Sequence, residues 1–145
     1  MFGTVRIKRM VATTAALLVI GVTGFHHGMT AQASGSPQAR TVTVQVVLRD
    51  FTISMSSHRL PAGKPVRFVI TNRGKAMHEV VLERAGAVDK ALEVRGKEYE
   101  ADDIAPGTSR TVTWTVPRAG SYQLACHMPG HFQMGMKTLF TVHGS

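Results

Sequence analysis

Apolar and polar residues alternate along much of the chain from residue 41 onward, with the period of two that is typical of β-strands buried on one face. Four tetrapeptides rich in turn-forming residues separate these stretches: LPAG at 60–63, NRGK at 72–75, APGT at 105–108 and PRAG at 117–120. Short strands at this spacing favour an all-β fold, a Greek-key β-sandwich or barrel of about seven or eight strands. The predicted strands cover residues 41–48, 51–55, 66–71, 78–82, 111–116, 122–125 and 137–142.

One segment departs from this alternation. In residues 88–99 (VDKALEVRGKEY), leucine and valine mix with charged residues without a period of two. We expect one or two helical turns before Gly96, over about residues 88–95. No internal repeat accompanies the strands, so the chain does not have the pattern of a solenoid or a propeller.

The N-terminus has the three parts of a secretory signal peptide. Three basic residues within positions 6–9 precede an uncharged run at 11–25 (VATTAALLVIGVTGF), and AQA at 31–33 supplies the small residues of a cleavage site. The run of about 15 residues is short of the roughly 20 that span a bilayer, although a retained N-terminal anchor is the alternative. We expect cleavage after residue 33, a flexible tail over 34–40 and a single domain over 41–145. The mature protein would then be exported, periplasmic or otherwise extracytoplasmic, and without a membrane span.

The charge of the chain argues against a nucleic-acid partner. The formal net charge is +8 at pH 7, and loss of the three basic residues of the leader would leave +5. The remaining basic residues are scattered singly, without a run of five and without interleaved aromatic residues. Nucleic-acid binding is therefore not expected, whereas a positive face that steers an acidic partner fits this composition.

The stretch ACHMPGHFQMGM at 125–136 concentrates side chains that bind soft metals. It contains Cys126, the only cysteine of the chain, with two histidines and three methionines. A single cysteine forms no intramolecular disulfide, and a free thiol in an oxidising compartment is prone to oxidation. Pro129-Gly130 favours a tight turn that brings His131 back toward Cys126, and Gly135 allows a second turn that returns Met136. Thiolate, imidazole and thioether donors together suit copper.

An electron-transfer copper site of this kind needs a second histidine from elsewhere in the chain. His78 is the best candidate, because it stands where the turn at 72–77 enters a predicted strand. His58 and His143 are further candidates, although solvent exposure is the simpler interpretation of both. Three alternatives to a metal ligand exist for Cys126: an inert buried thiol, a nucleophile, or one half of an intermolecular disulfide.

From about residue 41 to residue 142 the chain resembles the cupredoxins, the blue copper proteins that include azurin, plastocyanin, rusticyanin and auracyanin. The matching motifs are Asn72 with MHE at 77–79, the strand GSYQLAC at 120–126, and the spacing Cys-x4-His-x4-Met. The resemblance implies one type 1 copper ion with His78, Cys126 and His131 as equatorial ligands and Met136 as the axial ligand.

The resemblance also implies a role as a monomeric carrier of single electrons that cycles between Cu(I) and Cu(II). A redox partner would dock near His131, where Met128, Pro129 and Phe132 would form a small apolar patch. Asn72 would hydrogen-bond toward the loop of His78, with an ordinary turn asparagine as the alternative. Trp114 and Tyr122 are expected in the core, with Tyr122 bracing a corner of the Greek key.

Two residues of the loop compete with the implied ligands. Met134 is a second possible axial donor, but it leaves few residues after His131 in which to turn. His127 follows Cys126 directly, and neighbours on an extended chain point to opposite sides, so His127 should face away from the metal. Zinc also accepts one cysteine and two histidines, which leaves the identity of the metal in the cell open.

Three other functions are alternatives to electron transfer. The serious rival is a periplasmic copper carrier or resistance protein that exchanges copper with copper-handling proteins and uses Met77, Met128 and Met134 as auxiliary donors for Cu(I). A metal-free adhesion sandwich is weakened by the set of metal-binding residues. An enzyme is not expected, because a multicopper oxidase needs another domain and a hydrolase needs an oxyanion hole of which the sequence gives no sign.

Overall fold

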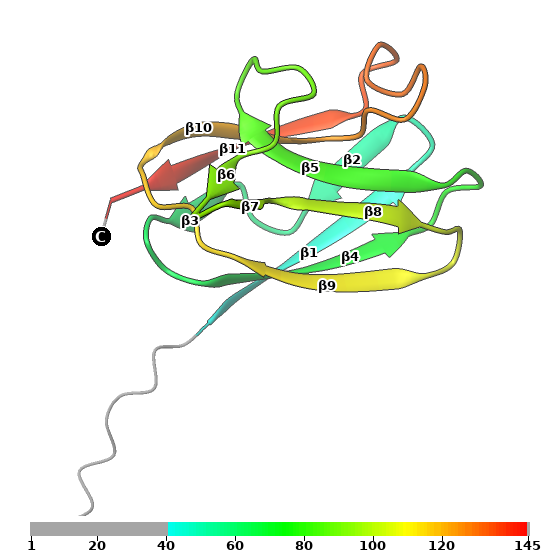
Figure 1. The fold of residues 1–145 in the computed structure, drawn as a ribbon. Coiled ribbons are helices and arrows are strands. Elements are labelled where there is room, and N and C mark those ends of the chain that lie inside the picture. The colour runs from blue at the N-terminus through cyan, green and yellow to red at the C-terminus, as the bar shows by residue number, and fades with distance from the viewer. Residues whose placement is uncertain (1–40, 145) are drawn as a thin grey trace, which may run out of the picture. The chain divides into compact units, whose positions relative to one another are not determined.

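The computed structural model describes residues 41–144, and the predicted signal peptide at 1–33 and tail at 34–40 lie outside the described residues. Residues 41–144 form two β-sheets that face each other, together with a short hairpin (Figure 1). One sheet has the strand order β2-β1-β4-β9 and the other has β3-β11-β10-β5-β8. The all-β prediction is confirmed. The strands are β1 (Val42–Arg49), β2 (Thr52–Met55), β3 (Arg59–Pro61), β4 (Val66–Asn72), β5 (His78–Arg84), β6 (Glu93–Val94), β7 (Lys97–Glu98), β8 (Glu100–Ile104), β9 (Ser109–Trp114), β10 (Gly120–Ala125) and β11 (Lys137–His143).

The chain passes repeatedly from one sheet to the other. After β1 and β2 it enters the second sheet at β3 and returns as β4, which lies parallel to β1 with Val46 opposite Ile70. Connections of this kind make the Greek-key pattern. The two strands that carry the predicted metal ligands, β5 and β10, are antiparallel neighbours with Leu82 opposite Leu124. The start of β5 therefore lies beside the end of β10.

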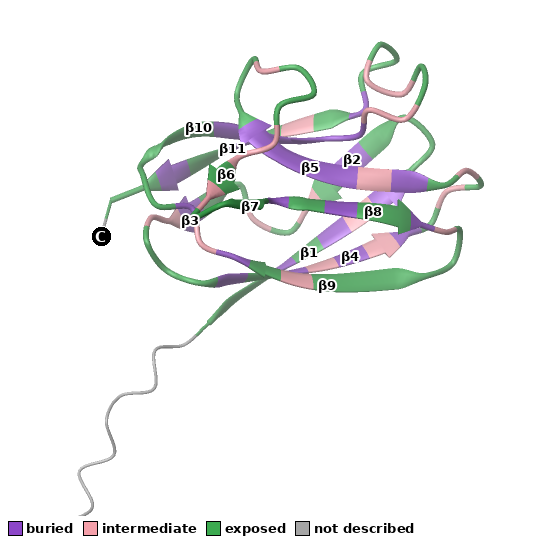
Figure 2. Ribbon diagram, in the orientation of Figure 1, coloured by how far each residue is buried: buried purple, intermediate pink, exposed green. Residues whose placement is uncertain are grey.

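Alternate residues of the strands fill the space between the sheets. β1 buries Val44, Val46 and Leu48, whereas the residues between them are at least partly exposed (Figure 2). Trp114 is buried as predicted and packs on Phe68, with 5.2 Å between the ring centroids. Burial of each large apolar side chain stabilises the fold by about 1.5 to 3 kcal/mol, so this shared core holds the two sheets together.

The helical turns expected over residues 88–95 are wrong. This segment forms bends and then the first strand of the β6–β7 hairpin. Asp89 has a φ of 51°, in the left-handed region that interrupts a right-handed helix. The backbone N–H of Leu92 donates to the carbonyl of Leu82 at 2.7 Å, and so joins β5 and not a helical turn.

Four short strands, β3, β6, β7 and β8, were absent from the predicted set. Each has five residues or fewer, and in β8 only Ala101 and Ile104 are buried, so they show little alternation. Within residues 41–144 no α-helix is present, and none of the described segments is a helix able to cross a membrane.

Tyr122 fixes the corner that leads into β10. Its side chain is fully buried, and its hydroxyl donates to the carbonyl of Arg118 at 2.9 Å. The turn at 117–120 is thereby fastened to β10, the strand that delivers Cys126. The predicted brace is confirmed.

Candidate metal centre

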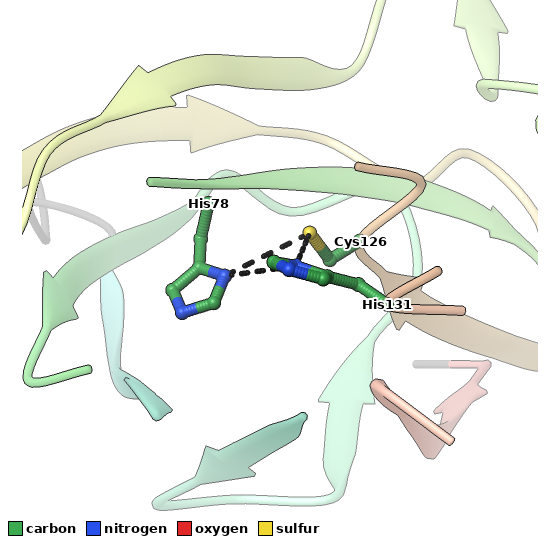
Figure 3. Close-up of side chains that lie close together, drawn as sticks. All are labelled: His78, Cys126 and His131. Atoms are coloured by element: carbon green, nitrogen blue, oxygen red, sulfur yellow. Dashed lines mark hydrogen bonds between the residues drawn. The ribbon is translucent and has the colours of Figure 1, made fainter. Parts of the chain in front are cut away.

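Three potential metal-binding side chains from separate parts of the sequence meet at one end of the sandwich (Figure 3). His78 is the first residue of β5, Cys126 follows the last residue of β10, and His131 lies in the loop beyond it. The Nδ1 atoms of the two histidines are 3.2 Å apart. The Sγ atom of Cys126 lies 3.5 Å from Nδ1 of His131 and 4.0 Å from Nδ1 of His78. The structure thus brings together the two histidines and the cysteine that the sequence singled out.

Backbone hydrogen bonds close the loop at 126–136. The N–H of Cys126 donates to the carbonyl of Met136 at 3.1 Å, and the N–H of Met136 donates to the carbonyl of His131 at 3.0 Å. Gly130 has a φ of 83°, which supports the turn predicted from Pro129-Gly130. Cys126, His131 and Met136 are therefore tied to one another through the main chain.

The loop before His78 is held by the side chain of Asn72, which is fully buried at the end of β4. Its Nδ2 donates to the carbonyls of Ala76 and Ile104, each at 2.8 Å. Its Oδ1 accepts from the N–H of Gly74 at 2.8 Å. The predicted hydrogen bonding from Asn72 toward the ligand loop is confirmed, and it fixes where β5 begins.

Burial shifts the pKa of each fully buried donor in the direction that favours its neutral form. It lowers the pKa of His78, and the charge of nearby His131 lowers it further against an opposing effect of Asp50. Burial also raises the pKa of the Cys126 thiol, although the backbone N–H groups of Glu79 and Met128 act the other way. Neutral imidazole is the form that binds metals, whereas the thiol must lose its proton on binding. A bound cation would drive that deprotonation.

The geometry of the three donors fits one small metal ion. Metal–nitrogen bonds of about 2.0 Å and metal–sulfur bonds of about 2.3 Å place two donors of one ion roughly 3 to 4 Å apart, as in this cluster. The two ring nitrogens and the sulfur face one another, and together they carry more lone pairs than hydrogen atoms that could be shared between them. A bound cation would accept these lone pairs. With a thioether from Met136 as fourth donor, the set is the one that copper prefers.

The other candidate histidines lie elsewhere. Nδ1 of His58 donates to the carbonyl of Leu139 at 2.7 Å, and His143 is an exposed residue at the end of β11. Nε2 of His127 lies 3.0 Å from a carboxylate oxygen of Glu83, which is fully buried. His127 therefore turns away from the cluster, as predicted.

Burial separates the two candidate methionines of the loop. Met136 is fully buried and belongs to the core cluster, whereas the side chain of Met134 is 65% exposed. Met77 is exposed as well, and Met128 is partly buried against the core. The inward position of Met136 agrees with the sequence-based preference for it over Met134.

Sequence analysis missed two residues at this site, Asp50 and Phe51, which form the turn between β1 and β2. A carboxylate oxygen of Asp50 lies 3.6 Å from Nε2 of His78. The ring of Phe51 meets the ring of His131 edge to face, with 5.5 Å between centroids. The only hint in the sequence was an acidic residue between the predicted strands at 41–48 and 51–55, followed by an aromatic residue at the start of the second.

Comparison with protein families and characterised proteins finds a cupredoxin-like domain and two copper proteins that are similar to this chain. A family model described as a cupredoxin-like domain matches residues 14–139. The copper-resistant cuproprotein CopI of Pseudomonas aeruginosa is 30% identical over 88% of this chain and 94% of that protein. The copper-resistant cuproprotein CopI of Rubrivivax gelatinosus is 35% identical over 65% of this chain and 62% of that protein.

Solved structures of two auracyanins share the fold. Auracyanin B aligns with a TM-score of 0.58 at 25% identity, over 70% of this chain and 88% of that one. Auracyanin A of Chloroflexus aurantiacus, a "blue" copper protein, aligns with a TM-score of 0.55 at 20% identity, over 72% of this chain and all of that one (100%).

Proposed function

This chain belongs to the family of cupredoxin-like domains and has, within residues 41–144, a single copper site, and we propose that His78, Cys126, His131 and Met136 are the four ligands of the ion. The observation that carries this proposal is the convergence of the two Nδ1 atoms and the Sγ atom at 3.2 to 4.0 Å. Met136 is the fourth ligand because it is buried and tied through its backbone to both Cys126 and His131. Copper bound there supplies one-electron chemistry between Cu(I) and Cu(II).

The function that we propose is protection of the cell from excess copper by an exported protein that holds the ion. This proposal is supported by the two relatives whose names are copper-resistant cuproproteins, one of them matched over 94% of its length. The proposal therefore prefers the copper-handling role, which the sequence left as the main alternative, over the role of electron carrier. The exposed thioether of Met77, which directly precedes His78 in the sequence, suits a protein that takes up Cu(I).

Electron transfer is the second candidate, and one observation favours it. His78 and Cys126 are fully buried, whereas His131 is only half-buried, so its ring is the route from the centre to the surface. A protein that docks on this ring would come closest to the ion. The two candidates share the same ligands and differ in whether partner proteins cycle the bound ion between Cu(I) and Cu(II).

Copper tolerance of cells that lack this protein tests the first candidate. Cells that carry the wild type or Met134→Leu should regain growth in excess copper, and cells that carry Cys126→Ser should not, because they lose the thiolate. Equal tolerance with and without the wild type would contradict copper protection. Fast electron exchange by protein that keeps its copper against a Cu(I) chelator would then favour the electron carrier.

The cellular setting belongs to the same proposal. We place the mature protein outside the cytoplasm after removal of the leader at residues 1–33, as a non-catalytic monomer that meets copper-handling or redox proteins near His131. N-terminal sequencing of protein from an extracytoplasmic fraction should begin at Ser34. Cytoplasmic protein that retains Met1 would contradict this part of the proposal.

A further inference from the structure

The turn between β1 and β2 contacts both histidines of the cluster. Its two residues, Asp50 and Phe51, face His78 and His131 respectively. We propose that this turn positions the copper ligands, with Asp50 setting the tautomer of His78 and Phe51 setting the ring orientation of His131. The inference rests on the proposed ligand roles of the two histidines. Both turn residues act through a ligand and neither contacts the ion.

Asp50 is held in place by the loop that leads into β5. Its Oδ1 accepts from the backbone N–H groups of Lys75 at 2.9 Å and Ala76 at 3.3 Å. The same oxygen lies 3.6 Å from Nε2 of His78, a buried atom without a hydrogen-bond partner among the described residues. At this distance the negative charge of the carboxylate, and not a hydrogen bond, favours a proton on Nε2. The lone pair of Nδ1 is then free on the side of Cys126.

Gly74 makes the approach of Asp50 to His78 possible. A Cβ atom on this residue would lie 2.5 Å from Oδ1 of Asp50 and 2.8 Å from Nε2 of His78. Gly74 is not among the glycines with positive φ, so its backbone conformation does not call for glycine. Glycine is required here because a side chain would occupy the space between the carboxylate of Asp50 and the imidazole of His78. The chain therefore keeps this pair in contact by omitting a side chain.

Phe51 has a backbone conformation that costs stability. Its φ is 65°, in the left-handed region that disfavours residues with a Cβ. Its side chain is 42% exposed, so burial of the ring offsets this strain only in part. The ring stands nearly perpendicular to that of His131, at 84°, and restricts its rotation. Strain of this kind is common beside functional sites.

The test compares Asp50→Ala, Asp50→Asn and Phe51→Gly with Asp102→Ala, which removes an exposed carboxylate from β8. Nitrogen NMR of the metal-free protein reports the tautomer of His78, and chelator competition and EPR report the copper site. Asp50→Ala should mix the tautomers and lower copper affinity roughly 10- to 100-fold. Asp50→Asn keeps an oxygen that accepts from Lys75 and Ala76. It should therefore recover part of the tautomer preference of His78 and part of the copper affinity. Asp102→Ala should match the wild type.

Phe51→Gly should keep the thermal midpoint near that of the wild type, because glycine accepts the positive φ. Its EPR spectrum should nevertheless change as the ring of His131 gains freedom. Folded Asp50→Ala and Phe51→Gly proteins with wild-type tautomer, affinity and spectrum would overturn the inference. Wild-type copper binding by Cys126→Ser would instead overturn the ligand assignment, so the two failures are distinguishable.

Discussion

The Nδ1 atoms of His78 and His131 lie 3.2 Å apart, although 53 positions separate the residues in sequence. Each atom is placed by its own loop: one loop is fixed by Asn72, and the other is closed by the hydrogen bonds of Cys126 and Met136. The donors therefore stand together through contacts within the protein. A site arranged in this way needs little reordering to bind a metal, and less ordering entropy opposes binding.

Replacement of the buried methionine should change the copper site, whereas replacement of the exposed one should not. Met136→Leu is expected to keep copper but to raise its reduction potential, because the lost thioether stabilises Cu(II). Met134→Leu, at a side chain that is 65% exposed, is the matched control and should behave as wild type. Voltammetry and visible spectra of both variants check this. An altered potential in Met134→Leu alone would transfer the role of fourth ligand to Met134.

Asn72 should contribute to stability even without metal. Asn72→Ala removes three hydrogen bonds of a buried side chain, and we expect a loss of about 2 to 4 kcal/mol in the free energy of unfolding. Thr71→Ala, which removes a single exposed hydrogen bond to Ser109, should lose about 1 kcal/mol or less. Urea unfolding of the metal-free proteins measures both. Equal losses would mean that Asn72 does not brace the loop.

Tyr122 should matter for the fold and not for the metal. Tyr122→Phe removes the hydrogen bond to the carbonyl of Arg118 and should lower the free energy of unfolding by about 0.5 to 1.5 kcal/mol. The copper spectrum should stay as in the wild type, because the hydroxyl faces the turn at 117–120. An unchanged midpoint of urea unfolding would show that the corner does not depend on this hydrogen bond.

The sequence predicts the part of the site that is local. Cys126, His131 and Met136 lie within one loop whose turn residues indicate that it folds back on itself, and this arrangement is confirmed. His78 was identified because it stands where the turn at 72–77 enters a predicted strand. Asp50 and Phe51 could not be found in the same way, since their positions depend on a turn between other strands.

The errors in the predicted fold also come from contacts between segments that are distant in the sequence. β8 escaped detection because its residues (EADDI) are mostly charged, and only its pairing with β5 makes it a strand. Residues 88–95 were expected to be helical because their composition permits it. Their backbone instead joins β5 through Leu92 and Leu82, a contact that local propensity does not encode.

Glu100 is expected to make the stability of the protein depend on pH. Desolvation, followed by repulsion from Asp102 and Glu98, raises its pKa above the ordinary value of 4.5. The folded chain then binds this proton more tightly than the unfolded chain, so ionised Glu100 lowers stability. Glu100→Gln should raise the thermal midpoint at pH 7, and the gain should vanish as the pH falls below about 4.5.

Thermal unfolding of the metal-free protein between about pH 4 and pH 8 measures this effect. Glu93→Gln, at an exposed position of β6, serves as the control for loss of one negative charge. A gain in Glu100→Gln that persists at the lowest pH would show that the ionisation of Glu100 is not its cause.

The central claim is that Cys126 binds copper as a thiolate beside His78 and His131. Its most direct test is titration of the purified protein with Cu(II), followed by visible absorption and EPR, with Cys126→Ser in parallel. The account predicts one equivalent of copper, an intense thiolate-to-copper absorption band and its complete loss in Cys126→Ser. Colourless wild-type protein, or a Cys126→Ser variant with an unchanged spectrum, would contradict it.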